Sequence, residues 1–340
     1  MTSVRVERLY KIFGPQPAEQ VRRLDEGADT SALPEGTTAA VVDASFSVQE
    51  GETFVVMGLS GSGKSTLIRM LNGLLTPTSG QVFVDDADIT AMSGRELRTM
   101  RQQKMSMVFQ HFALFPHRTV LDNAGYGLRI RGVPDDEIST RAAEALGMVG
   151  LDGWEQRYPQ QLSGGMRQRV GLARALAAGT DVLLMDEAFS ALDPLIKREM
   201  QDQLLELNAQ LGKTIIFITH DLNEAMRLGD RIAVMRAGRI VQIGDSEQIL
   251  SEPADDYVAE FVQDVDRSRV LTAGSIADPS GAAPAGVTPV PATAPLRDLF
   301  DRIGRNGPLP VVDAQQRVIG VVTPQAVFTA LSHRTELEEA

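Results

Sequence analysis

The sequence contains no cysteine among its 340 residues. This absence excludes disulfide bonds and thiolate metal sites and is compatible with a reducing compartment. The four histidines show no spacing typical of metal ligands. No stretch approaches the roughly 18 apolar residues of a membrane-spanning helix, and the first residues lack the apolar core of a secretion signal. We therefore expect a chain that is neither secreted nor membrane-spanning and that reaches a membrane only through a partner.

Basic residues are also in deficit. The chain has 33 Lys and Arg against 45 Asp and Glu, which gives a net charge of −12. This balance disfavours a general attraction to nucleic-acid phosphate, so we expect no nucleic acid as a partner. The length suits two domains, at about 150 residues per domain.

The most informative feature that is present is a glycine-rich loop at residues 58–66, with the sequence GLSGSGKST. It fits the pattern G-x-x-x-x-G-K-S/T, and it lies between an apolar strand expected at 54–57 and a helical run that starts near Lys64. This context argues against a chance glycine-rich turn. The inward-pointing N–H groups of such a loop hold polyphosphate. The residues expected to bind nucleotide are Gly58, Ser60, Gly61, Ser62, Gly63, Lys64, Ser65 and Thr66.

Four side chains have expected roles around this loop. Lys64 would reach the β- and γ-phosphates as a point charge, and the Ser65 hydroxyl would complete the coordination of Mg²⁺. The apolar strand at 182–185 is followed by Asp186 and Glu187, which should point in opposite directions because side chains alternate along a strand. Asp186 then suits Mg²⁺, directly or through water, and Glu187 suits a water in line with the γ-phosphate. The alternative is a pair of solvated acids.

The apolar patterning predicts an α/β chain interrupted by a mostly helical region. Strands are expected at 4–13, 41–48, 54–57, 81–84, 106–109, 182–185 and 214–219, with two more across 232–243. Helices are expected from 64 to about 74, at 135–148 and at 164–178, and a long helix is opened by Asp193 and Pro194. Residues 14–38 carry three prolines around a short helix at 18–24 and are expected to be a surface excursion.

Residues 162–168 read LSGGMRQ, a serine and two glycines at the start of a helix. This segment matches the signature of the ABC transporter ATPases, and Gln110, the carboxylate pair, residues 190–193 and His220 follow the family order. The chain thus resembles the ABC nucleotide-binding domain. The fold implied is an α/β P-loop NTPase of ABC type, with a RecA-like core, an antiparallel β subdomain and a helical insert. Two copies of this domain meet head to tail around ATP, so the resemblance implies a dimer.

The resemblance also implies residue roles. Gln110 would couple the γ-phosphate and Mg²⁺ to the helical insert, Glu187 would activate water, and His220 would contact the γ-phosphate and stabilise the transition state. A lone histidine is more often structural, but the position of His220 after the strand at 214–219 favours the catalytic role. Ser163 and Gly165 would serve the partner's ATP. Asp193 completes the expected nucleotide-binding set.

An aromatic side chain that stacks on adenine usually precedes the phosphate loop in this family. Phe13 fits best, because it follows the first strand. The alternative makes Tyr10 the stacking residue and Phe13 part of the core. The insertion at 14–38 leaves both readings open.

Residues 112–123 resemble the segment that meets a coupling helix of the membrane subunit in importer ATPases. Residues 57–66 and 185–196, with the insertion after residues 11–14, resemble the ATP-binding subunit of glycine betaine/proline betaine importers, a likeness that covers about 4–265. It implies a quaternary-amine-transporting ATPase that uses ATP and Mg²⁺ for osmoprotection. Its partners would be a second copy of itself, integral membrane permease subunits and, indirectly, a substrate-binding protein. It would be peripheral, on the cytoplasmic face of the inner or plasma membrane.

The composition changes near residue 265, and 273–295 is rich in Ala, Gly, Pro and Thr. We expect an ATPase domain at 1–264 with its helical insert at about 111–178, a linker at 265–295 and a small α/β unit at 296–340. From near residue 287 this unit resembles a single CBS motif, whereas members of the importer family end in a pair. A single motif lacks its intrachain partner, so it is either a dimerisation or regulatory unit or an inert remnant.

Two other functions stay open. One is an ABC importer ATPase for another solute, and the other is a regulatory ATP switch without transport. The choice among betaines, choline and carnitine depends only on the subfamily resemblance, because the solute would not touch this chain.

Overall fold

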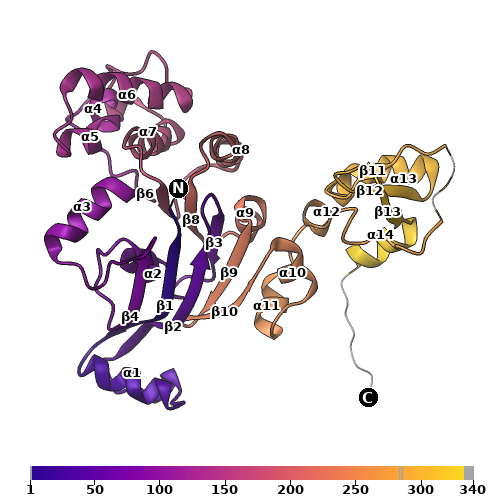
Figure 1. Cartoon of the computed structure of the whole chain (residues 1–340), viewed down its shortest axis with the longest axis horizontal. Coiled ribbons are helices and arrows are strands. Elements are labelled where there is room, and N and C mark those ends of the chain that lie inside the picture. The colour runs from indigo at the N-terminus through magenta and orange to yellow at the C-terminus, as the bar shows by residue number, and fades with distance from the viewer. Residues whose placement is uncertain (1, 283, 285, 333–340) are drawn as a thin grey trace. The chain divides into compact units, whose positions relative to one another are not determined.

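The computed structural model describes residues 2–282, 284 and 286–332 (Figure 1). The chain divides into two compact units, residues 1–243 and 244–340. The last eight residues of the small unit expected at 296–340 lie outside the described residues. In the described part of the chain, no helix is both long and apolar enough to cross a membrane.

The first unit contains a four-stranded sheet in the order β2-β1-β4-β5. All three of its strand pairs are antiparallel, and Val4 lies opposite both Val48 and Val84. Val4 and Val6 are buried while Arg5 is exposed, as the alternating sequence predicts. The strands are β1 (Val4–Phe13), β2 (Thr38–Val48), β4 (Ser79–Val84) and β5 (Ala87–Asp88).

The second sheet has six strands in the order β10-β9-β3-β8-β7-β6, and β6, β7, β8, β3 and β9 run parallel to one another. Every residue of β3, β7 and β8 is buried. Parallel strands deliver their carboxyl ends to one edge of a sheet, where ligands bind in α/β folds. The bounds are β3 (Thr53–Met57), β6 (Met105–Phe109), β7 (Val182–Asp186), β8 (Thr214–Thr219), β9 (Arg231–Arg236) and β10 (Arg239–Gly244).

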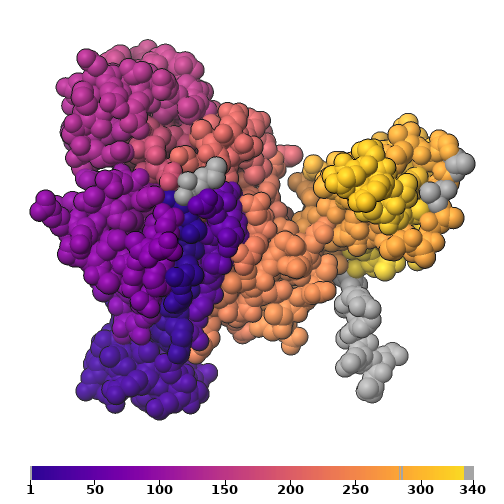
Figure 2. Space-filling model, in the orientation of Figure 1, coloured from indigo at the N-terminus to yellow at the C-terminus, as the bar shows by residue number. Residues whose placement is uncertain are grey.

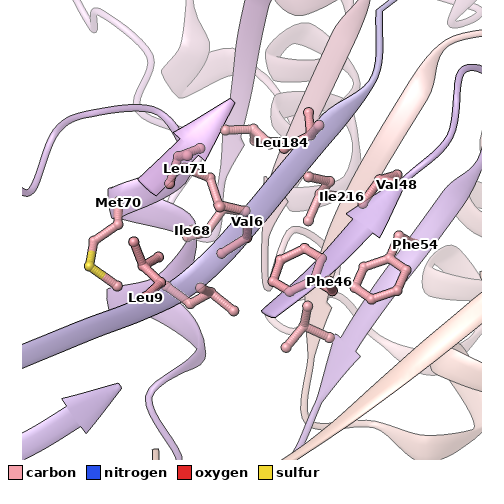
Figure 3. Packing of buried hydrophobic residues seen from close by; sticks show 14 of the residues in the cluster. Val6, Leu9, Phe46, Val48, Phe54, Ile68, Met70, Leu71, Leu184 and Ile216 are labelled. Atoms are coloured by element: carbon pink, nitrogen blue, oxygen red, sulfur yellow. The ribbon is translucent and has the colours of Figure 1, made fainter. Parts of the chain in front are cut away.

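One hydrophobic core joins the two sheets (Figure 3). Phe46 of β2 and Phe54 of β3 stack with ring centroids 4.9 Å apart. Helix α2 (Lys64–Leu71) adds Ile68 and Leu71 to the same core. The helix ends before the expected residue 74, because Gly73 adopts a left-handed conformation with φ 65°. The core therefore fixes the strand before the phosphate loop and the helix after it.

A helical segment projects from this body (Figures 1 and 2). It comprises α4 (Val120–Ala124), α5 (Tyr126–Ile130), α6 (Asp135–Met148) and α7 (Gly164–Ala177), within the range expected for the helical insert. Trp154, the single tryptophan of the chain, is partly exposed in the connection between α6 and α7. The other long helices of the unit are α3 (Gly94–Lys104) and α8 (Pro194–Leu211), and α9 (Leu222–Leu228) is shorter.

The excursion between β1 and β2 packs a small core of its own. Helix α1 (Pro17–Asp25) buries Val21 and Leu24 against Tyr10, Ile12 and Val42. The short helix η1 (Thr30–Ala32) follows. The spacing of Val21 and Leu24 on one helical face explains why this segment packs against the sheet rather than remaining a solvated loop.

The second unit contains a three-stranded sheet, β11-β12-β13. Strand β11 (Val290–Pro291) pairs in parallel with β12 (Leu309–Val312), and β13 (Val318–Val322) is antiparallel to β12. Isolated bridges join Thr272 to Pro295 and Asp278 to Val321, so residues in the range expected to form a linker pair with this unit. Its helices are α10 (Ser246–Ser251), α11 (Asp256–Phe261), α12 (Arg267–Val270), η3 (Leu296–Leu299), α13 (Phe300–Asn306) and α14 (Pro324–Leu331).

Candidate nucleotide-binding and hydrolysis site

The loop at residues 58–66 connects β3 directly to α2. Gly58 and Gly63 adopt φ values of 154° and 103°. A Cβ atom at Gly58 would clash with the carbonyl oxygen of Met235, and one at Gly63 with that of Ala40. The backbone can follow this path only with glycine at both positions. The Ser62 hydroxyl is buried in the loop and has no hydrogen-bond partner, so the loop retains an unpaired polar group for a ligand.

Lys64 is buried at the first position of α2. Its ammonium donates to the carbonyl oxygens of Gly58 at 2.8 Å and Leu59 at 3.0 Å, so the charge lies within the curve of the loop. Burial lowers the pKa of Lys64, and the negative charges of Glu187 and Asp186 oppose that shift. The loop therefore holds a partly desolvated cation, which suits a phosphate anion.

Ser65 and Asp186, the expected Mg²⁺ ligands, lie together. The Ser65 hydroxyl donates to Oδ1 of Asp186 at 3.0 Å. Burial raises the pKa of Asp186, and the bond from Ser65 opposes that rise. These hard oxygen donors are of the type that Mg²⁺ prefers, and too few to hold the ion without phosphate oxygens or water. No group of three or more His, Asp or Glu suited to a metal occurs among the described residues.

Gln110, Glu187 and His220 come from the ends of β6, β7 and β8 and meet beside this loop. The His220 Nδ1 lies 3.1 Å from Oε2 of Glu187. The Gln110 amide donates to the same Glu187 oxygen at 3.5 Å and to the hydroxyl of Ser190 at 3.1 Å. The structure thus brings the three expected catalytic residues together around one carboxylate.

Ser163, Gly165 and Asp193 mark the starts of two adjacent helices. Ser163 caps α7 by accepting from the Met166 N–H at 3.2 Å, and Asp193 caps α8 by accepting from the Ile196 N–H at 3.1 Å. In the described part of the chain, no hydrogen bond links these three residues to the loop at 58–66.

Phe13 and Tyr10 have different environments at the end of β1. The Phe13 ring is 44% exposed, with the Lys11 ammonium 5.1 Å from its centroid. Tyr10 is 3% exposed and its hydroxyl donates to Asp25 at 2.5 Å. Of the two aromatic rings considered for adenine, Phe13 is therefore the one available for stacking.

The chain that carries this site is similar to known proteins. Residues 41–190 match the family described as ABC transporter. The chain is 46% identical to the glycine betaine transport ATP-binding protein OpuAA of Bacillus subtilis, over 98% of this chain and 93% of that protein. It is 47% identical to the glycine betaine/proline betaine transport system ATP-binding protein ProV of Escherichia coli, over 99% and 84%. The chain belongs to the ABC transporter family. The family expected from the sequence is confirmed.

The fold expected for an ABC transporter ATPase is confirmed as well. A solved dimeric structure of the ATP-binding cassette MJ0796, in a post-hydrolysis state with ADP and Pi, matches with a TM-score of 0.61. That chain is 31% identical in sequence, and the match covers 72% of this chain and 98% of that one. The part of this ABC transporter chain that matches corresponds to an ABC cassette. The remaining residues lie outside the match.

Sequence reasoning missed one residue that shapes the Gln110 loop. Arg174, in the last turn of α7, donates to the carbonyl oxygens of Phe112 at 3.2 Å and Ala113 at 2.6 Å. Phe112 and Ala113 both have positive φ values, 54° and 47°, so this cation ties down a strained turn. Burial lowers the pKa of Arg174. The sequence carries no local signal for this contact, because the carbonyl oxygens that Arg174 reaches belong to residues 61 and 62 positions earlier in the chain.

Proposed function

We propose that this chain is the ATP-hydrolysing subunit that energises import of glycine betaine, proline betaine or a related quaternary amine through a membrane permease. The observation that carries this proposal is the convergence of Lys64, Asp186, Glu187 and His220 at one sheet edge, in a chain whose ABC relatives are transport ATP-binding proteins. The substrate class comes from those relatives' activities and not from a solute site in this chain.

The loop at 58–66 would bind the ATP phosphates through its N–H groups and the Lys64 ammonium. Ser65 and Asp186 would hold Mg²⁺ together with phosphate oxygens, and Gln110 would reach the ion when ATP is bound. When bound, Mg²⁺ neutralises charge on the β- and γ-phosphates. The Phe13 ring would stack on adenine. The unpaired Ser62 hydroxyl, and the close backbone packing that only glycine allows at Gly58 and Gly63, support this assignment.

Hydrolysis would depend on Glu187 and His220. The Glu187 carboxylate would accept a hydrogen bond from the attacking water and orient it toward the γ-phosphate. His220 would hold that carboxylate through Nδ1 and contact the γ-phosphate as charge develops. Gln110, which bonds to Glu187 and Ser190, would report the occupied state to the helical insert.

Among the described residues, Ser163, Gly165 and Asp193 form no hydrogen bond to the phosphate loop, and we propose that they serve a second copy of the chain. Two copies arranged head to tail would place these residues of one copy on the ATP of the other. The solved structure of MJ0796 is dimeric, which supports the same arrangement here. Each chain would then supply half of each hydrolysis site.

A groove of about 390 Å³ in the first unit supports a contact between this chain and the permease. Tyr126 and Ile130 line it from the helical segment, Phe115 lines it from the loop before α4, and Met107 lines it from β6. This groove includes part of the segment at 112–123 that resembles a coupling contact. An apolar helix end of a permease subunit would fit here, and it would hold the chain on the cytoplasmic face of the membrane. A substrate-binding protein would act on the far side, without touching this chain.

For the remainder of the chain we propose the organisation expected from the sequence: an ATPase domain at 1–264, a connection at 265–295 and a single CBS-like motif at 296–340. The strand and helix order of the second unit, with a parallel β11-β12 pair, is compatible with one such motif. Its proposed role is regulation or dimerisation.

The test is uptake of labelled glycine betaine, proline betaine and choline at high osmolarity, in a deletion strain complemented with the wild type or variants. Lys64→Ala removes a charge-assisted phosphate contact worth about 1.5–3 kcal/mol, so we expect weaker ATP binding and no uptake. Lys104→Ala is the matched control, because Lys104 pairs with Asp85 away from this site. Normal ATP affinity in Lys64→Ala would contradict the phosphate contact. ATPase activity without uptake of any of the three solutes would contradict the osmoprotectant assignment.

A further inference from the structure

A buried carboxylate lies next to the proposed site and has no role in it so far. Glu224 of α9 is 2% exposed. A buried charge is costly unless it is paired and hydrogen-bonded. Its oxygens accept from the Thr219 hydroxyl and from the Gln201 amide at 3.2 Å, and the Lys197 ammonium lies 3.6 Å away. Burial raises the pKa of Glu224, and the Thr219 bond, the Lys197 charge and the Gln201 bond oppose the rise.

This network holds the residues on both sides of His220. Thr219 precedes the histidine, and its Oγ1 also accepts from the Asp221 N–H at 2.9 Å. The Asp221 carboxylate accepts from Lys197 at 2.6 Å and from the N–H of Glu224 at 3.2 Å, which caps α9. The His220 side chain is itself 52% exposed. Its position therefore depends on the backbone that Thr219 and Asp221 fix.

The other end of the network is the first part of α8. Lys197 and Gln201 are one helical turn apart on this helix. The Lys197 N–H donates to the carbonyl oxygen of Asp193 at 2.9 Å. Asp193 stands at the exposed start of α8, where the proposed partner's ATP would lie. A chain of direct bonds thus runs from Asp193 through Lys197 to the loop that carries His220.

We propose that Thr219, Glu224 and Lys197 form a positioning network for His220 that also couples the His220 loop to the Asp193 end of α8. An apolar cluster would hold α9 against α8 without the desolvation cost of buried charges. Directional hydrogen bonds to Thr219 and Asp221 fix the backbone angles around His220, which an apolar cluster would not do. This inference rests on the proposed function, since it assigns His220 to hydrolysis.

The test compares two threonines at opposite ends of β8. Thr219→Val removes the network hydroxyl at nearly constant volume, and Thr219→Ser keeps it. Thr214→Val is the matched control, because the Thr214 hydroxyl is equally buried, donates to the Thr2 carbonyl oxygen at 2.7 Å and accepts from the Gly51 N–H at 3.1 Å. We expect Thr219→Val to lower the ATPase kcat about 10-fold or more with KM for ATP within about twofold. Thr219→Ser should recover most of kcat, and Thr214→Val should keep it.

Repeating Thr219→Val in a His220→Ala background separates positioning from general damage. If Thr219 acts through His220, the second substitution lowers the residual kcat by less than about twofold. An equal fold-loss in both backgrounds, or an equal loss in Thr214→Val, would overturn the proposal. If Thr219→Val does not fold, the double variant Lys197→Met, Glu224→Gln takes its place. It removes one positive and one negative charge, and the same changes in kcat are expected of it.

A second measurement does not depend on turnover. The imidazole ¹H–¹⁵N resonances of His220, assigned with His220→Ala, should shift in Thr219→Val and stay in place in Thr214→Val. Unmoved resonances in both variants would contradict the network. A wild-type chain without ATPase activity would overturn the proposed function, while a shift confined to Thr219→Val would still support the network.

Discussion

Glu187 takes a backbone conformation that is rare for a residue other than glycine. Its φ is 47°, which costs about 1–3 kcal/mol and is found mainly at functional sites. Its N–H donates to the Ile218 carbonyl oxygen of strand β8 at 3.0 Å and its carbonyl accepts from the Ser190 N–H at 3.1 Å, so the neighbouring strand and the turn's own backbone hold this conformation. The turn aims the carboxylate at His220 while Asp186 stays directed at Ser65.

At this scale we expect Glu187→Gln to keep ATP binding and to lower kcat by about 10²–10⁴-fold, because the amide keeps the size but loses the negative charge that orients water. The ATP-bound dimer should persist longer than in the wild type. Steady-state hydrolysis and size-exclusion chromatography with ATP check both expectations. Glu199→Gln, at an exposed position of α8, serves as control. Turnover near the wild-type rate in Glu187→Gln would exclude it as the base.

The site residues that could be predicted from the sequence are those that lie in contiguous motifs. Lys64 and Ser65 belong to one loop, and Asp186 follows an apolar strand, so local pattern and strand order locate them. Arg174 and Glu224 could not be found this way. Arg174 contacts backbone carbonyls of a distant loop, and Glu224 joins Thr219 to Lys197 and Gln201 of another helix. Only the tertiary fold brings these groups together.

Helix α1 shows how an element can be recognised while its packing is missed. Its prolines and charges indicated a surface excursion, yet Val21 and Leu24 pack on Tyr10 of β1. Helix α3 was missed although Ser93 and Glu96 form a capping box, a signal that sequence patterns do contain. The buried strands β3, β7 and β8 were recovered because their apolar runs have five or six residues and are rich in Val, Ile and Leu, a length typical of strands and too short for most buried helices.

The contact between Tyr10 of β1 and Asp25 of helix α1 gives a prediction of how stability depends on pH. Burial first, and then the bond to Asp25, raise the pKa of Tyr10 from its usual value near 10 to about 12. The folded form therefore favours the neutral phenol. This contribution to stability, about 3 kcal/mol, is complete below pH 10 and is lost as the pH rises through about 12.

The check is an ultraviolet titration of tyrosinate in the wild type and in Tyr10→Phe. The difference between the two curves should have its midpoint near pH 12. Tyr158→Phe is the control, since Tyr158 is exposed. A difference curve centred near pH 10 for Tyr10→Phe would mean that the helix α1 contact does not hold in solution.

The whole chain combines a cassette with a second unit whose fold is harder to predict from the sequence. The α/β class and the helical insert could be predicted, because motif order identifies the cassette. The strand β11 could not, because it has two residues, one of them proline, in a stretch whose composition is typical of linkers. Its pairing with Val311 and Val312 depends on strands that come later in the chain.

At this scale we expect deletion of residues 270–340 to leave ATP hydrolysis intact and to change how transport depends on salt. The cassette has its own core, and ionic strength acts most strongly on exposed charges. The measurement is hydrolysis and uptake by the reconstituted transporter over a range of salt concentrations. An unchanged salt response would leave the second unit without a regulatory role.

The single tryptophan described between α6 and α7 has a practical consequence. Trp154 belongs to the helical segment, and the body of the unit, with Lys64 and Glu187, has no indole of its own. Tryptophan fluorescence of this ATPase therefore reports on its helical segment alone. Because the chain also has no cysteine, one introduced thiol could carry an acceptor dye on the sheet, and energy transfer from the indole would follow the segment's motion during a single catalytic cycle.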